Sequence, residues 1–202
     1  IELENPREYI SLAWVLAKDY HRAFAMTVEN AGQVRKILQQ CTSSTTKPLK
    51  WLTGAGITVS NRYNRRLKTS DGMSHQYRAS SVWKEKSHRT IRLARYDENK
   101  FDGSKMRQSI APNFVHSLDA SHMMMAINSM AEKGITYFHM VHDSFATHAA
   151  NIELMRDAVR STFVELHRDD PLARIAKSYD IEISGRGDFD IERVLNSKYM
   201  IH

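Results

Sequence analysis

The sequence predicts an α+β fold, mostly helical, with a small antiparallel sheet and a basic β-hairpin insertion. Apolar residues recur at helical spacing in several long segments, and short β-prone runs are separated by turn residues. Glycine and proline together contribute only 12 of the 202 residues, 8 Gly and 4 Pro. This composition predicts a folded core and excludes collagen and broad disorder.

The first predicted unit, residues 1–55, is a helical segment. Pro6 suits the first turn of a helix, and the helical pattern continues to residue 40. Four apolar residues follow the i, i+3, i+4, i+7 spacing of one buried face: Ile10, Ala13, Trp14 and Ala17. Residues 49–52 and 57–59 flank the sequence Thr-Gly-Ala-Gly, so we expect a strand, a turn and a strand.

The second predicted unit, residues 56–106, is a basic insertion. Residues 56–107 carry 13 basic and 5 acidic side chains, and their net charge of +8 exceeds the +6 of the whole chain. Asp71-Gly72 predicts a turn, and the flanks 76–83 and 88–96 are expected to pair as a hairpin. Cations bind phosphates and interleaved aromatic rings can stack on bases, so the composition suggests a nucleic-acid partner. A solvated, charged hairpin would have the same composition.

The third predicted unit is residues 107–202. Pro112 is expected to begin a helix over 113–131, and Gly134 suits its C-terminal cap. The other expected elements are strands over 135–141 and 144–147, helices over 151–168 and 172–178, and a last short amphipathic segment.

Polar side chains recur every three residues along the helix expected over 113–131. They are Asn113, His116, Asp119 and His122. Successive members rotate by about −60° on an α-helix, so the row drifts around one side. Such residues commonly cap helices or form hydrogen bonds inside a core. For each of them alone, and for His122 above all, the spacing favours that structural interpretation.

A His142-Asp143 pair occupies the bend between two expected strands. A carboxylate fixed at a strand bend can bind a hard divalent ion, which prefers anionic oxygen ligands. Nucleotidyl transfer uses two such ions about 3.5–4 Å apart. Turns also favour Asp for local reasons, so the pair alone is weak evidence for a metal site and its spacing favours the structural interpretation.

Several classes of protein are excluded by composition. The single cysteine, Cys41, excludes an internal disulfide framework and a Cys-rich zinc site, and fits a reducing compartment. No apolar run approaches the roughly 18–20 residues of a membrane span. The chain begins Ile-Glu-Leu-Glu, without Met or a signal peptide, and we interpret it as a piece of a longer protein.

Two motifs resemble the single-subunit, bacteriophage-type RNA polymerases, a family that includes the mitochondrial RNA polymerases. The first, residues 107–122, contains Pro-Asn-Phe-Val-His-Ser, and the second is Val-His-Asp-Ser-Phe at 141–145. The continuation 146–150 and the ending 189–199 are similar to the family as well. The close resemblance covers about 107–202, whereas residues 1–106 match loosely.

The resemblance implies the C-terminal palm and fingers portion of a DNA-directed RNA polymerase. Residues 1–55 would be a fingers and palm segment, 56–106 a specificity-loop-like insertion, and 107–202 the palm portion. The partners would be template and promoter DNA, the RNA transcript and nucleoside triphosphates. The RNA 3′-hydroxyl would attack the α-phosphate, assisted by two Mg²⁺ ions.

The resemblance also implies roles for individual residues. Asp143 would hold the Mg²⁺ ions, with His142 beside the RNA 3′ end, and His116 would lie near the nascent base pair and the nucleotide sugar. The neighbours Asn113, Ser117 and Asp119 would support that helix. The arginines expected to contact phosphates or bases are Arg62, Arg65, Arg66, Arg78, Arg89 and Arg92, because a planar fork can grip guanine or phosphate bidentately.

The sequence departs from the family in two respects. It lacks a second palm aspartate and a fingers helix bearing an Arg, a Lys and a Tyr-Gly pair. One carboxylate cannot assemble a two-metal site, so this chain alone is not expected to polymerise RNA. The missing part would lie in the same protein or in another chain, since some phage enzymes of this family are split.

Three alternatives stay open. Family A DNA polymerases share the His-Asp hairpin, although they more usually have an acidic residue where this sequence has Ser144. A non-catalytic nucleic-acid-binding module would use only the basic block, and a structural subunit would have no site. The expected location is the host cytoplasm, as for a phage enzyme, with the mitochondrial matrix as second choice.

Overall fold

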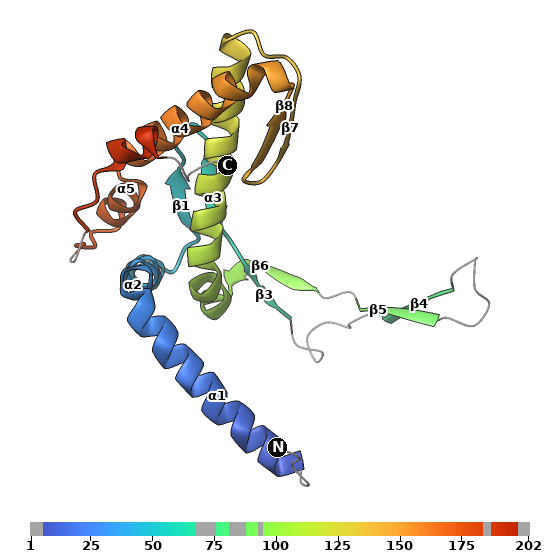
Figure 1. The fold of residues 1–202 in the computed structure, drawn as a ribbon. Coiled ribbons are helices and arrows are strands. Elements are labelled where there is room, and N and C mark those ends of the chain that lie inside the picture. The colour runs from blue at the N-terminus through green and yellow to red at the C-terminus, as the bar shows by residue number, and fades with distance from the viewer. Residues whose placement is uncertain (1–5, 68–75, 81–87, 93–94, 184–186, 198–202) are drawn as a thin grey trace.

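The computed structural model describes residues 6–67, 76–80, 88–92, 95–183 and 187–197 (Figure 1). Helices and small antiparallel strand pairs make up this part, which confirms the predicted α+β class. The predicted turn at Asp71-Gly72 lies outside the described residues. Within the described part, none of the helices has the length and apolar character needed to cross a membrane.

The N-terminal helical stretch forms two helices, α1 (Pro6–Thr27) and α2 (Glu29–Ser43). The chain leaves helical geometry between them at Val28, whose φ is −122°. Helix α2 packs on the body, whereas α1 projects away from it (Figure 1). Every side chain from residue 9 to 27 is exposed.

The two strands expected around Thr-Gly-Ala-Gly form an antiparallel pair, β1 (Leu49–Leu52) and β2 (Thr58–Asn61). The turn between them needs a glycine at Gly56, because its φ of +78° lies in the left-handed region. Strand β1 alternates buried and exposed residues, and it buries Leu49 and Trp51 against the core.

The basic block forms an arm of two antiparallel strand pairs that leads away from the body (Figure 1). At the root of the arm, β3 (Asn64–Arg66) pairs with β6 (Tyr96–Phe101). Further out, β4 (Gln76–Ser80) pairs with β5 (His88–Arg92), which confirms the predicted hairpin pairing between the two flanks.

The central helix α3 (Gly103–Glu132) begins earlier than expected. The prediction that Pro112 begins this helix was wrong, because Asp102 is the N-cap and its carboxylate accepts a hydrogen bond from the Lys105 amide at 3.0 Å. Pro112 lies inside the helix, where a missing N–H typically costs about 3 kcal/mol. Burial of Met106, Ile110 and Phe114 on both sides of this position offsets that cost.

The C-terminal elements follow the predicted order. Strands β7 (Phe138–Val141) and β8 (Ser144–Thr147) form a tight hairpin, and the chain then enters α4 (Ile152–Arg168) through a single 3₁₀ turn, Ala149–Asn151. Helix α5 (Pro171–Ser178) and a 3₁₀ helix (Ile191–Asn196) complete the described part.

Two apolar clusters hold these elements together. The first joins α2, β1, α3 and α5, with Leu38, Leu49 and Ile110 fully buried at its centre. The second joins the C-terminal part of α3 to α4 through Met130, Met155 and Val159. The side chains of the β7–β8 hairpin pack against this second cluster, so the hairpin has a fixed position beside α3 and α4.

Candidate functional site

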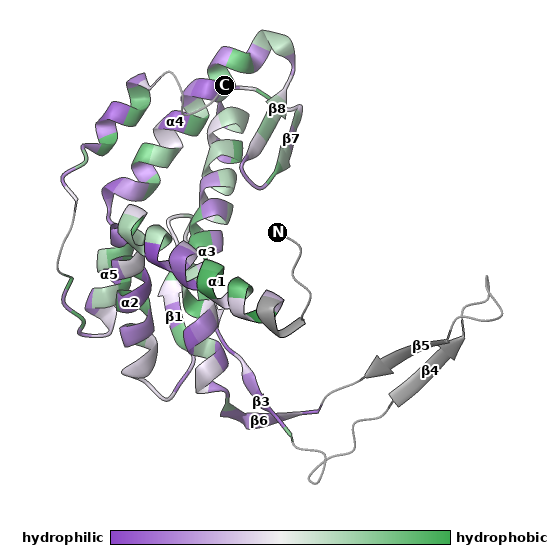
Figure 2. Cartoon of the chain, turned by 60° about the horizontal axis from the view of Figure 1, so that its bottom comes forward, coloured by the Kyte–Doolittle hydropathy of each residue, from purple (hydrophilic) through white to green (hydrophobic). Residues whose placement is uncertain are grey.

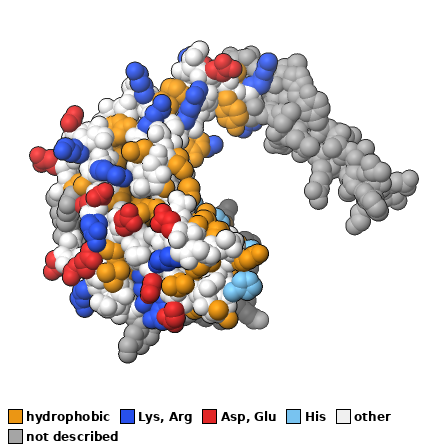
Figure 3. All heavy atoms as spheres, turned by 90° about the horizontal axis from the view of Figure 1, so that it is seen from above, with side chains coloured by type: hydrophobic (Ala, Val, Ile, Leu, Met, Phe, Trp, Pro, Cys, Tyr) orange, Lys and Arg blue, Asp and Glu red, His pale blue; other side chains and the backbone are white. Residues whose placement is uncertain are grey.

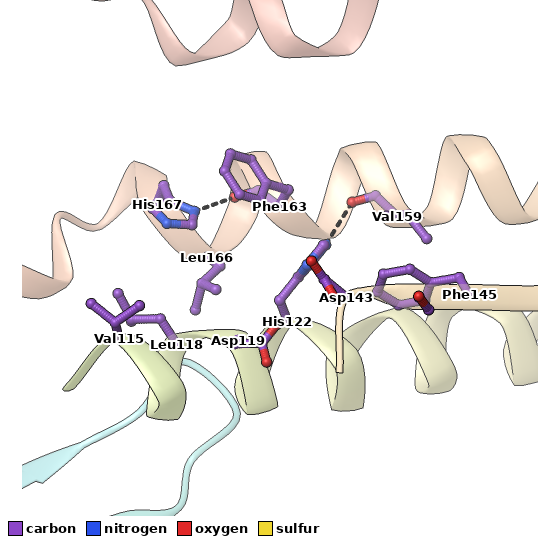
Figure 4. Close-up of a pocket in the computed structure, with 11 residues that line it drawn as sticks. Val115, Leu118, Asp119, His122, Asp143, Phe145, Val159, Phe163, Leu166 and His167 are labelled. Carbon is purple, nitrogen blue, oxygen red and sulfur yellow. Dashed lines mark hydrogen bonds between the residues drawn. The ribbon is translucent and has the colours of Figure 1, made fainter. Parts of the chain in front are cut away.

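A pocket of about 750 Å³ lies between α3 and α4, with the tip of the β7–β8 hairpin at its edge (Figure 4). Helix α3 contributes residues one helical turn apart on the face that looks toward α4, and α4 contributes an apolar wall. The lining residues are Val115, Leu118, Asp119, His122, Asp143, Ser144, Phe145, Val159, Phe163, Leu166 and His167.

The hairpin tip places Asp143 at this pocket. Val141 and Ser144 are the last paired residues, so His142 and Asp143 form the bend itself. His142 has a φ of +53°, a left-handed conformation that costs a non-glycine residue about 1 kcal/mol. Below the bend, the half-buried ring of Phe145 meets the His122 ring edge to face, with centroids 5.7 Å apart. The exposed Asp143 carboxylate is therefore carried on an anchored hairpin.

A second carboxylate, that of Asp119 on α3, lines the same pocket. Its Oδ2 lies 3.8 Å from Nδ1 of His142, and its side chain is 32% exposed against 84% for His142. Asp119 is thus the inner and Asp143 the outer acid of the site. Sequence reasoning gave Asp119 only a supporting role, because helical spacing could not show that the hairpin bends toward it.

The fit of this site to a divalent ion is incomplete. Two carboxylates at one pocket offer the anionic oxygens that a hard ion prefers. However, the described residues contain no group of three or more His, Cys, Asp or Glu side chains placed to hold a metal. The donor set therefore fits a divalent ion only if further oxygen ligands come from outside these residues.

Two members of the predicted polar row have structural partners. The Asn113 amide donates to Oδ1 of Asn61 at 2.9 Å and to the hydroxyl of Tyr63 at 3.1 Å, and this bond lowers the pKa of Tyr63. Nε2 of His122 donates to the Val159 carbonyl at 2.8 Å. Burial lowers the pKa of His122, which keeps the imidazole neutral at neutral pH.

The neighbouring Ser117 has a structural partner as well. The Trp51 indole N–H donates to Oγ of Ser117 at 3.0 Å, which ties β1 to α3. His116 is exposed and does not line the pocket that contains Asp143. Its expected position beside a nascent base pair stays a prediction.

The six predicted arginines all belong to the arm or to its root. Arg65 and Arg66 are exposed in β3, and Arg62 is exposed just before it, with its guanidinium 5.5 Å from the centroid of the Phe101 ring. Strand β4 contains Arg78, and strand β5 contains Arg89 and Arg92. The side chains of these three arginines are outside the described part of the structure.

Sequence reasoning missed four further cations at the root of the arm. They are Lys47, Lys50, Lys100 and Arg107, which line two hollows together with Arg62 and Arg65. The two lysines of the α2–β1 segment precede the basic block in the sequence. The pairing of β1 with β2 places Lys50 opposite Ser60, and the fold then brings this segment beside Arg62 and Phe101.

Comparisons with known proteins agree on one family. A family model described as DNA-dependent RNA polymerase matches residues 11–185. The chain is 30% identical, over 211 aligned positions, to the mitochondrial DNA-directed RNA polymerase 1 of Nicotiana sylvestris, covering 99% of this chain and 20% of that relative. It is 32% identical to DNA-directed RNA polymerase 1A of Nicotiana tabacum, covering 77% of this chain and 96% of that relative.

A chloroplastic relative gives a similar result. The chain is 34% identical to the chloroplastic DNA-directed RNA polymerase 3B of Nicotiana tabacum, over 77% of this chain and 15% of that relative. The chain thus spans about a fifth of the length of the mitochondrial relative described above.

Proposed function

Because the chain belongs to the single-subunit, phage-type family of DNA-dependent RNA polymerases, we propose that it supplies part of the catalytic palm of such an enzyme. The observation that carries this proposal is the position of Asp143. An exposed carboxylate on an anchored hairpin, at the edge of a pocket, is suited to hold a divalent ion beside a growing strand. The reaction would be template-directed transfer of nucleotides from nucleoside triphosphates to RNA.

We propose that Asp143 is the direct ligand of Mg²⁺ and that Asp119 acts next to it. Mg²⁺ is usually held by one or two carboxylates plus substrate phosphates, so the protein need not supply a complete cage. When bound, two such ions would activate the attacking RNA 3′-hydroxyl and stabilise the leaving pyrophosphate. A further aspartate from the remainder of the polymerase would complete the ligand set.

The neighbouring histidines would contact the nucleic acid rather than the metal. His142 is 84% exposed at the bend, so its imidazole is free to lie against the RNA 3′ end. At 3.8 Å, the Asp119 carboxylate would favour the orientation in which the His142 ring turns toward α3. His116, exposed on α3, would contact the nascent base pair or the nucleotide sugar.

The three predicted units take distinct roles in this proposal. Residues 1–55 would be a fingers and palm segment, and 107–202 the palm portion with the hairpin. Residues 56–106 would be the specificity-loop-like arm, which would contact promoter DNA and the transcript through its arginines. The projection of β3–β6 and β4–β5 away from the body supports this role for the arm (Figure 1).

We infer that the remainder of the polymerase covers α1. Large apolar side chains are exposed on opposite faces of this helix, including Trp14 at 66%, Leu16 at 60% and Phe24 at 54%. Apolar residues, in green, recur along the ribbon of α1 in Figure 2. A helix that is apolar on several sides normally lies buried within a larger protein or a membrane, and no described helix is suited to span a membrane. The additional length of the relatives supports a protein partner, in the same chain or in another.

The names of the relatives suggest where in the cell the enzyme works. The mitochondrial and chloroplastic polymerases that this chain resembles support an organelle as the working place of the enzyme. The expected phage enzyme in a host cytoplasm stays a prediction.

Nucleotide incorporation by the assembled enzyme tests the proposed function. A primed template, Mg²⁺ and labelled ribonucleotides should give RNA, and deoxyribonucleotides should be incorporated much less well. Preferential use of deoxyribonucleotides would instead indicate a family A-like DNA polymerase. If no nucleotide is incorporated while template binding stays intact, the chain would be a non-catalytic nucleic-acid-binding module.

A further inference from the structure

The side-chain amide of Asn61 ties the root of the arm to the central helix. Asn61 is the last residue of β2 and is fully buried, at 0% exposure. Its Nδ2 donates to the Met106 carbonyl at 2.8 Å, and its Oδ1 accepts hydrogen bonds from Oγ of Ser109 at 3.1 Å and from Nδ2 of Asn113 at 2.9 Å. A buried amide with both of its ends bonded fixes the elements that it joins, because a displacement would leave polar atoms unpaired.

The contacts of Asn61 lie on both sides of Pro112. A proline inside a helix has no N–H to donate to the carbonyl four residues earlier, and proline is a usual site of helix kinks. Met106 precedes this position in α3, and Asn113 follows it. Asn61 therefore braces α3 where the two parts of the helix can most easily change their angle.

Tyr63 continues this brace into the arm. Its hydroxyl accepts the other hydrogen bond that Nδ2 of Asn113 donates, at 3.1 Å, and the Lys105 ammonium lies 5.1 Å from the centroid of its ring. The Tyr63 carbonyl accepts the N–H of Asp102, the N-cap residue of α3, at 2.9 Å. The next residue begins β3, and β6 returns from the arm directly into this cap. Both strands at the root of the arm are thus fixed to the first half of α3.

Beyond the brace, α3 leads to the candidate site. Residues 113–132 contain neither glycine nor proline, so this part of the helix moves as one rod. His116 follows Asn113 by three residues, and Asp119 follows by three more, with its Oδ2 3.8 Å from Nδ1 of His142. A tilt of this rod at the proline would carry Asp119 away from the hairpin tip. The brace therefore sets where these side chains lie relative to the arm.

We propose that Asn61 and Asn113 are positioning residues that couple the arm to the part of α3 that carries His116 and Asp119, so that DNA held by the arm is aligned with the acids of the pocket. Lys and Arg side chains lie where the arm leaves the body (Figure 3), so the brace lies between the proposed DNA contact and Asp119. The inference rests on the proposed function. It goes beyond support of the helix, because it predicts a coupling between two separate sites.

Three measurements on the assembled enzyme test this coupling in the variant Asn113→Ala, which removes the donor to both Asn61 and Tyr63. They are the affinity for a promoter duplex, selected from random duplexes by its binding to the native enzyme, the RNA synthesis that starts on this duplex, and the extension of an RNA primer on a template without promoter. Synthesis from the promoter should fall about tenfold, a usual size for a coupling between sites.

Promoter affinity and primer extension should stay within about twofold in Asn113→Ala. The arginines of the arm are unchanged, and on the primed template the primer places the RNA end without help from the arm. A side chain that only stabilises the fold would instead lower all three quantities together. A parallel fall in all three, or promoter-dependent synthesis at the native rate, would overturn the proposal.

Tyr63→Phe removes only the hydroxyl that accepts from Asn113, so it should give the same pattern at smaller size, and it tests the proposal even if Asn113→Ala does not fold. The double variant Asn113→Ala/Tyr63→Phe should lose no more than Asn113→Ala alone, because both changes break one link. Losses that multiply would show two independent effects and would overturn the coupling.

Trp51→Phe is the matched control. It removes another buried hydrogen bond between a strand and α3, from the indole N–H to Oγ of Ser117 at 3.0 Å, without touching the brace. The ratio of promoter-dependent to primed synthesis should therefore stay at the native value. A fall of this ratio as large as that in Asn113→Ala would show that any loosened strand has this effect, and the proposal would fall.

Amide hydrogen exchange provides a readout that does not depend on RNA synthesis. Binding of the selected duplex should slow exchange in residues 96–101 of the arm and in residues 113–120 of α3, whereas in Asn113→Ala it should slow exchange in the arm only. Slowing of α3 that is equal in the variant, or absent in the native enzyme, would overturn the coupling. If no RNA is made while the exchange result holds, the polymerase proposal falls and the coupling stands. If RNA is made while α3 does not respond, the reverse holds.

Discussion

Replacing Asp143 by Asn in the assembled enzyme is expected to lower RNA synthesis at least about a thousandfold, while promoter binding stays nearly unchanged. The substitution keeps the shape of the side chain and removes the charge that would hold the divalent ion. Loss of a metal that stabilises the transition state by several kcal/mol corresponds to a thousandfold or more in rate. Because Asp143 is exposed at the bend, the variant should fold normally.

Asp157→Asn is the matched control for this experiment. Asp157 is an exposed acid on α4 that does not line the pocket, so its loss should leave synthesis within about twofold of the native rate. Synthesis that persists in the Asp143 variant would refute the metal role of this acid. A non-catalytic nucleic-acid-binding module or a structural subunit would then explain the chain better.

Removing two aromatic side chains from α1, in the variant Trp14→Ala/Phe24→Ala, is expected to weaken association with the remainder of the polymerase about a thousandfold. Both rings are more than half exposed, at 66% and 54%. Aromatic residues at the centre of an interface commonly contribute about 2 kcal/mol or more each, and about 4 kcal/mol is three powers of ten in affinity. If the remainder is a separate chain, titration calorimetry measures the loss directly.

If the remainder is covalently attached, the same variant should instead make α1 a preferred site of limited proteolysis. Lys18→Ala/Arg22→Ala is the control, because it removes two exposed cations from the same helix and leaves its apolar faces intact. If the double aromatic variant matches the control in its association or in its resistance to proteolysis, this result would show that the apolar faces of α1 bind nothing in the enzyme.

Local patterns in the sequence were sufficient to predict most of the elements. The apolar spacing predicted the helices, and the β-prone runs on both sides of His142-Asp143 predicted the hairpin. The start of α3 could not be predicted in this way. Pro112 is a typical first-turn residue, yet the cap at Asp102 and the burial of Met106 and Ile110 extend the helix through the proline.

Only part of the candidate site could be predicted, because only some of its features are local in the sequence. Asp143 was identified from its bend and from the family motif, both of which are local. The approach of Asp119 to His142 depends on how the hairpin packs on α3, and the cationic hollows at the root of the arm combine residues from α2, β1, β6 and the start of α3. Both are contacts between segments distant in the sequence, which periodicity and composition do not encode.

Cleavage of the backbone by bound iron tests directly whether Asp143 holds a divalent ion in the assembled enzyme. Iron(II) in place of Mg²⁺, with ascorbate and peroxide, produces hydroxyl radicals that cut the chain next to the ion. We expect cuts within residues 141–145 that excess Mg²⁺ suppresses and Asp143→Asn abolishes. Cuts that avoid this hairpin, or that persist unchanged in the Asp143 variant, would show that Asp143 does not hold the ion.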